Sequence, residues 1–117
     1  MRSDAALAHG DFKPWNLLAR QEGGVWQICG VLDWEFACAA TPLLDFATFL
    51  RDEQARPAGF ADSFAAAYRT AGGALPDGWR RLTRLVDLLN LLQMLQWSGD
   101  QATADLRRVV GETLDAL

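Results

Sequence analysis

The chain has 117 residues, which bounds it at one small domain, and half of its residues are hydrophobic, enough for a core. Its net charge of -4 and pI of about 4.8 argue against a nucleic-acid-binding protein, which usually presents a basic face. The longest apolar window, residues 82–95, is interrupted by charged and polar side chains, so we expect no membrane span.

The N-terminus and the cysteines suggest a cytoplasmic protein. The apolar run before His9 is too short for a signal peptide. Cys29 and Cys38 form neither a disulfide framework nor a zinc motif, and we expect them to be reduced and buried.

The first third of the chain predicts loops and strands. Residues 17–20 and 25–32 are suited to two strands, and residues 21–24 between them end in two glycines that tolerate a tight turn. An antiparallel hairpin brings its open ends together. We therefore expect Asn16, at its start, and Asp33, at its end, to meet.

From residue 41 onward the pattern is helical. Thr41 and Pro42 suit the beginning of a helix, and later glycines and prolines separate the segments. The expected helices cover residues 44–53, 60–70, 79–97 and 101–117. The third is apolar on most sides, which predicts a buried central helix.

These elements predict an α+β, mainly α-helical fold. We expect a single domain over residues 1–117, with loop and hairpin over residues 7–40 and a helical part over residues 41–117.

The residues with the most chemistry lie in residues 9–18, which read His-Gly-Asp-Phe-Lys-Pro-Trp-Asn-Leu-Leu. Phosphoryl transfer requires a carboxylate that orients the attacking hydroxyl and oxygen ligands that hold magnesium against the phosphates. Asp11 suits the first role, and Asn16 and Asp33 suit the second. Lys13 can contact a phosphate oxygen as a point charge.

The spacing from Asp11 to Asn16, with a basic residue between them, resembles the catalytic loop of protein kinases. With residues 32–35 (Leu-Asp-Trp-Glu) and 42–47 (Pro-Leu-Leu-Asp-Phe-Ala), this segment resembles the aminoglycoside phosphotransferase family of kinase-like enzymes, which is similar to choline kinases. The resemblance covers about residues 7–50 and implies a protein-kinase-like C-terminal lobe.

The resemblance also implies roles. Asp11 would be the catalytic base, Asn16 and Asp33 the magnesium ligands, and His9 and Asp45 the supports of the loop. It implies Mg²⁺, with ATP or another nucleoside triphosphate as co-substrate, and a small hydroxylated substrate. The acidic balance weakly favours a cationic one.

Simpler interpretations stand beside these roles. A buried, hydrogen-bonded His9 is favoured over a nucleophile or metal ligand, since the chain has no second histidine. Asp33 as a strand-end cap is the weaker alternative to a metal ligand. For Asp45, a charge at a helix N-terminus and a brace for the loop remain equally open.

Candidate substrate contacts are Trp34, Glu35 and Asp87. Glu35 has two open interpretations, a substrate contact or a solvated side chain. Asp87 recurs with Asn90 and Gln93 every three residues, and a solvated stripe is favoured over a cleft wall. The tryptophans suit a core or a cleft wall, and they are Trp15, Trp26, Trp34, Trp79 and Trp97.

Kinase-like enzymes also need a glycine-rich loop and a strand lysine in a nucleotide-binding lobe. The chain contains no such glycine motif, only eight residues precede His9, and Lys13 lies inside the catalytic loop. We therefore expect the C-terminal lobe alone, as a fragment, a truncated product or one half of a two-chain enzyme. The alternative is an inactive remnant or a helical binding module.

Overall fold

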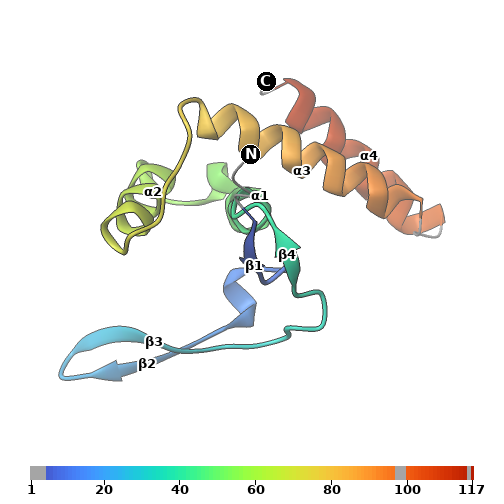
Figure 1. Cartoon of the computed structure of the whole chain (residues 1–117). Coiled ribbons are helices and arrows are strands. Elements are labelled where there is room, and N and C mark those ends of the chain that lie inside the picture. The colour runs from blue at the N-terminus through green and yellow to red at the C-terminus, as the bar shows by residue number, and fades with distance from the viewer. Residues whose placement is uncertain (1–4, 97–99, 116) are drawn as a thin grey trace. The chain divides into compact units, whose positions relative to one another are not determined.

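The computed structural model describes residues 5–96, 100–115 and 117 (Figure 1). In that part of the chain it has an α+β fold with four α-helices, two short 3-10 helices and two small antiparallel sheets. The predicted fold class is confirmed. The structure divides into two compact units, residues 1–51 and residues 52–117. The expectation of one domain over residues 1–117 stays a prediction.

The predicted hairpin forms in the first unit. Strand β2 (Leu17–Glu22) pairs antiparallel with β3 (Val25–Val31). Gly23 and Gly24 have φ values of 56° and 82°, the left-handed pair that a two-residue hairpin turn requires. This short turn lets β2 continue two residues beyond the expected end.

A bulge interrupts the hairpin. Leu18 lies opposite Gly30 and Ala19 opposite Ile28, so Cys29 is the extra residue. Cys29 is exposed, as is Cys38. The prediction of buried thiols was wrong, because the strands that carry them keep most of their side chains in solvent.

A second sheet was not predicted. Strand β1 (Ala6–Ala8) pairs antiparallel with β4 (Cys38–Ala40), with Ala8 opposite Cys38. Three-residue strands made mostly of alanine carry little local strand signal. The pairing joins the chain just before His9 to the chain just before the first helix, and so closes the loop between them.

Helix α1 (Leu43–Leu50) follows this sheet directly. Its first turn is supported by the Thr41 hydroxyl, which accepts a hydrogen bond from the Leu43 N–H at 3.3 Å. The helix ends three residues before the expected position, and a separate 3-10 turn, η2 (Glu53–Ala55), follows it. Six residues of α1 are buried, and all of them except the polar Thr48 belong to the apolar core of the first unit: Leu43, Phe46, Ala47, Thr48, Phe49 and Leu50.

The second unit contains three longer helices. Helix α2 (Phe60–Thr70) has the predicted bounds, and α3 (Trp79–Leu95) contacts α4 (Asp100–Asp115). We expected residues 98–100 to separate the last two helices, but Asp100 already belongs to α4. Residues 97–99, which include Trp97, lie outside the described residues. No described helix is long and apolar enough to cross a membrane.

The composition of helix α3 predicted burial on most sides, and this prediction was wrong. Its buried residues lie on one face, at Trp79, Thr83, Asp87 and Leu91, and its other leucines are partly exposed. The prediction of a solvated polar stripe was also wrong at Asp87, which is buried.

Arg80 ties the second unit together at the beginning of α3. Its guanidinium contacts Glu53 of η2 at 3.1 Å and Asp62 of α2 at 2.6 Å, and it lies over the Trp79 ring. The hydrogen bond to Asp62, helped by Glu53, raises the pKa of Arg80 above its ordinary value. Both ion pairs lie at the surface, where such pairs contribute little to stability.

Candidate active site

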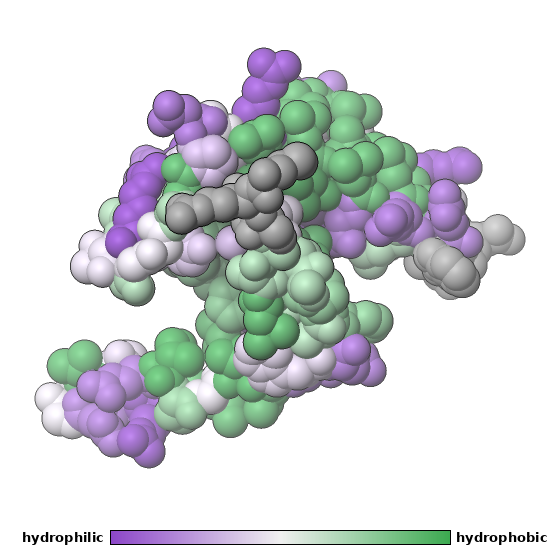
Figure 2. All heavy atoms as spheres, in the orientation of Figure 1, coloured by the Kyte–Doolittle hydropathy of each residue, from purple (hydrophilic) through white to green (hydrophobic). Residues whose placement is uncertain are grey.

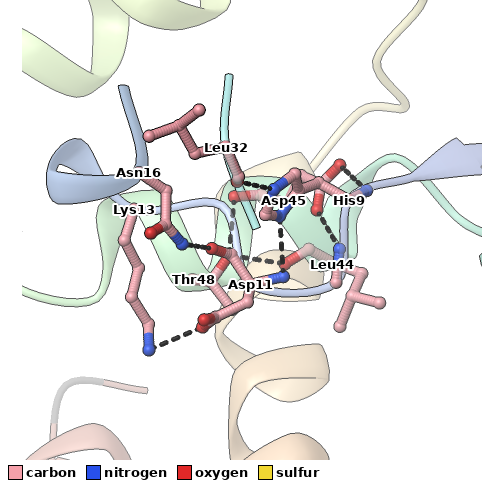
Figure 3. A network of polar contacts seen from close by, with 9 residues as sticks. His9, Asp11, Lys13, Asn16, Leu32, Leu44, Asp45 and Thr48 are labelled. Carbon is pink, nitrogen blue, oxygen red and sulfur yellow. Dashed lines mark hydrogen bonds and ion pairs between the residues drawn. The ribbon is translucent and has the colours of Figure 1, made fainter. Parts of the chain in front are cut away.

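The candidate site is built on the loop between β1 and β2, with Asp45 of α1 behind it. The Asp45 carboxylate accepts hydrogen bonds from the backbone N–H of His9 at 2.8 Å and of Gly10 at 3.0 Å (Figure 3). Asp45 is also the acidic residue of the first turn of α1. One side chain is thus placed for both suggested roles, a helix-terminal charge and a brace for the loop.

His9 is almost completely buried, and its ring connects two parts of the site. Nδ1 accepts a hydrogen bond from the Asp11 N–H at 3.1 Å, so the ring proton lies on Nε2, which donates to the Leu32 carbonyl at 2.7 Å. Both ring nitrogens are therefore used within the fold. This geometry agrees with a hydrogen-bonded core histidine rather than a nucleophile or metal ligand.

Aromatic rings enclose His9. The Trp34 ring lies 4.7 Å from the imidazole centroid, and the Phe12 ring lies 6.0 Å away in an edge-on arrangement. Phe12 in turn packs against Phe49 of α1 at 4.9 Å. The phenylalanine inside the motif therefore anchors the loop to the core, a role that its place among polar residues had not suggested.

Gly10 has a φ of 86°, and a Cβ at this position would overlap the backbone carbonyl of Phe36. Only glycine combines this conformation with such close backbone contact. The loop and the segment after β3 thus lie against each other at a point where no side chain fits.

Asn16 is buried at the end of the 3-10 turn η1 (Pro14–Asn16). Its Nδ2 donates a hydrogen bond to the Asp11 carbonyl at 2.9 Å, which leaves the side-chain oxygen Oδ1 as an acceptor for another group. Its backbone carbonyl accepts from the Leu32 N–H at 2.8 Å. The hairpin therefore brings Asn16 beside the residue that precedes Asp33.

Asp33 has a left-handed backbone, with a φ of 65°, and it is the one such non-glycine residue among those described. Aspartate adopts this conformation more readily than most residues, and strained backbone clusters at functional sites. The pattern of residues 30–35 gave no sign of it. The backbones of Asn16 and Asp33 lie near each other, and the convergence of their side chains stays a prediction.

The Asp11 carboxylate forms an ion pair with Lys13, with Oδ1 and Nζ 2.6 Å apart. About a quarter of each side chain is exposed, so the pair is open to solvent on one side. The Lys13 ammonium also lies 5.7 Å from the centre of the Trp15 ring. The candidate base and the candidate phosphate contact are thus neighbours.

The donor set suits magnesium. Among the described residues no three His, Cys, Asp or Glu side chains gather into a metal cluster. Magnesium does not require one, because it is usually held by one or two carboxylates together with water and substrate phosphates. Asn16 Oδ1, left free by its Nδ2 bond, and the Asp33 carboxylate fit that requirement.

The remaining candidates lie in different surroundings. Trp34 donates from Nε1 to the Val31 carbonyl at 2.8 Å and contacts His9, while Glu35 is exposed in the turn that follows. Asp87 is buried on α3 in the second unit. Trp15 and Trp26 are mostly exposed, so of the two interpretations, a core or a cleft wall, the structure contradicts the core for these two residues.

Comparison with known proteins decides the family. The model of the phosphotransferase enzyme family, APH, matches residues 1–85, well over half of the chain. The chain belongs to this family. The match includes the loop, the hairpin and α1, and it suggests a phosphotransferase-type enzyme. No curated protein and no solved structure matches the chain.

Proposed function

We propose that this phosphotransferase-family chain supplies the catalytic half of an ATP- and magnesium-dependent kinase that phosphorylates a hydroxyl group of a small molecule. The observation that carries the proposal is the loop itself. Asp11 is partly exposed beside Lys13, and its backbone is held by His9 and Asn16. A carboxylate fixed in this way is suited to orienting a hydroxyl and accepting its proton.

In the proposed reaction, the substrate oxygen forms a bond to the γ-phosphorus while the bond to the bridging oxygen of ADP breaks, and the hydroxyl proton passes to Asp11. Lys13 stabilises negative charge on the transferred phosphate. Asn16 Oδ1 and the Asp33 carboxylate hold Mg²⁺, which when bound neutralises charge on the phosphates. The roles of His9 and Asp45 are to keep the loop in place.

The proposed substrate class rests on the charge of the chain. The net charge of -4 favours a cationic acceptor such as an amino alcohol or an aminoglycoside. Trp34 and Glu35, on the exposed segment after Asp33, are the proposed substrate contacts near the loop.

The test is a phosphotransfer assay on the chain alone and on the chain joined behind a nucleotide-binding lobe of the same family. We expect little turnover from the 117-residue chain, which has no glycine-rich loop, and transfer to a hydroxylated amine from the joined protein. Asp11→Asn should lower that transfer by about 10²–10⁴-fold. Ordinary turnover by the chain alone, or a joined protein insensitive to Asp11→Asn, would contradict the proposal.

A second candidate function is a non-catalytic helical binding module. The exposed leucines of α3 favour it, because large exposed apolar surface commonly marks an interaction site. A joined protein that folds, transfers no phosphate and shows no response of Asn16 or Asp33 to Mg²⁺ with ATP would favour this module over the kinase.

A further inference from the structure

The left-handed backbone of Asp33 needs support from its neighbours. A residue other than glycine keeps such a backbone only where the surrounding structure over-determines it. The Asp33 side chain is exposed, and within the part of the chain that the structure describes it forms no hydrogen bond or ion pair. The support must therefore come from contacts of the residues on either side of it.

Leu32 provides the support before Asp33. Its backbone N–H donates to the Asn16 carbonyl at 2.8 Å, and its carbonyl accepts from His9 Nε2 at 2.7 Å (Figure 3). These two bonds fix the peptide unit that leads into Asp33. They do not fix φ of Asp33, which is the rotation that follows this peptide unit, so a second contact is needed after it.

Trp34 provides that second contact. Its indole Nε1 donates to the Val31 carbonyl at 2.8 Å, three residues back along the chain. This bond closes a ring that contains the backbone of Leu32 and Asp33, and therefore restricts φ of Asp33. The indole also lies 4.7 Å from the imidazole of the buried His9, which holds Leu32 from the other side.

We infer that Trp34 is a positioning residue for the metal site. Its indole hydrogen bond holds Asp33 in the left-handed conformation and so sets the direction of the Asp33 carboxylate before an ion binds. This role rests on the proposed function, in which Asp33 binds magnesium. A ligand already held in its binding conformation avoids the cost of being ordered when the ion arrives.

Two substitutions separate the indole N–H from the aromatic ring. Trp34→Phe removes the N–H and keeps a ring beside His9. Trp34→His loses the six-membered ring but carries Nε2 in the place of the indole Nε1, because each nitrogen is bonded to a ring carbon next to Cγ. The matched control is Trp26→Phe on β3, since Trp26 is also exposed; Figure 2 shows hydrophobic and hydrophilic residues side by side on the hairpin surface.

The first measurement needs neither metal nor nucleotide. The three-bond coupling between the amide proton and Hα of Asp33, in the ¹⁵N-labelled chain, reports its φ. We expect the coupling to change in Trp34→Phe, to stay unchanged in Trp26→Phe, and to be retained in Trp34→His at about pH 8, where imidazole is neutral. An unchanged coupling in Trp34→Phe overturns the inference. A folded Trp34→His chain with a changed coupling also overturns it, even where Trp34→Phe does not fold.

The second measurement is the Mg²⁺ affinity in the presence of ATP, from titration of the Asp33 amide signal. We expect an affinity about three- to tenfold weaker in Trp34→Phe, the effect of one hydrogen bond, and close to that of the unmodified chain in Trp34→His and Trp26→Phe. No acceptor substrate is present, so a lost substrate contact does not explain the change. Equal affinities in Trp34→Phe and the unmodified chain overturn the inference. An unmodified chain that does not respond to Mg²⁺ contradicts the proposed function instead, and the Asp33 coupling then decides the role of Trp34.

Discussion

Gly10→Ala is expected to destabilise the first unit by at least about 3 kcal/mol. Two costs add at this position. The backbone has a φ of 86°, which an L-residue resists, and the new Cβ overlaps the Phe36 carbonyl, which cannot move without disturbing the turn after Asp33. Urea unfolding followed by tryptophan fluorescence measures the loss.

Gly24→Ala is the matched control for Gly10→Ala. Gly24 has a φ of 82°, but nothing lies within contact distance of a Cβ there. It should therefore cost only the conformational part, about 1 kcal/mol. Equal losses at the two glycines would show that the loop does not lie against Phe36 as described.

Asp45→Ala should lower the free energy needed to open the loop by about 2–4 kcal/mol. The substitution removes the acceptor of two backbone N–H groups, those of His9 and Gly10, and each partly buried donor left without a partner costs about 1–3 kcal/mol. The measurement is amide hydrogen exchange at His9 and Gly10, whose protection reports local opening directly.

Asp45→Asn separates the two roles of this side chain. It removes the charge near the helix N-terminus but keeps one oxygen acceptor, so we expect roughly half of the loss seen for alanine. A charge at the helix N-terminus alone is worth only about 0.3–1 kcal/mol. If alanine and asparagine both cost no more than this, Asp45 does not brace the loop.

Local patterns predicted the elements whose signals are local. The two glycines at residues 23–24 make their own turn, and α2 begins and ends beside glycines, so the hairpin and this helix appear close to where they were expected. The pairing of β1 with β4 joins residues at least thirty positions apart, most of them alanines, and no local propensity encodes it.

The same difference between local and long-range signals applies to the candidate site. Residue types and spacing selected Asp11, Asn16 and Asp33 as candidates, because phosphoryl transfer requires a carboxylate and oxygen ligands for magnesium and because the spacing resembles that of a kinase catalytic loop. They did not reveal the left-handed backbone of Asp33 or the contact of Phe12 with Phe49, which depend on the tertiary fold. The exposure of Cys29 reflects a hairpin that keeps most of its side chains in solvent, which a strand pattern does not show.

The apolar content of α3 led to a wrong prediction, that of a helix buried on most sides. Leucines on several sides of a helix predict burial on several sides, but burial also requires a neighbour for each side. The helix has one buried face, and four of its leucines remain exposed: Leu82, Leu85, Leu89 and Leu92. Composition thus identified an apolar surface correctly and could not identify what covers it.

The proposed function requires that Asn16 and Asp33 hold one magnesium ion beside Asp11. Its most direct measurement is NMR of the ¹⁵N-labelled chain, titrated with Mg²⁺ in the presence of ATP. The account predicts saturable shifts of the Asn16 side-chain amide and the Asp33 backbone amide, lost in Asp33→Asn, which tolerates the same backbone, and retained in Glu35→Gln. Shifts absent at both residues, or equally strong in Asp33→Asn, would contradict it.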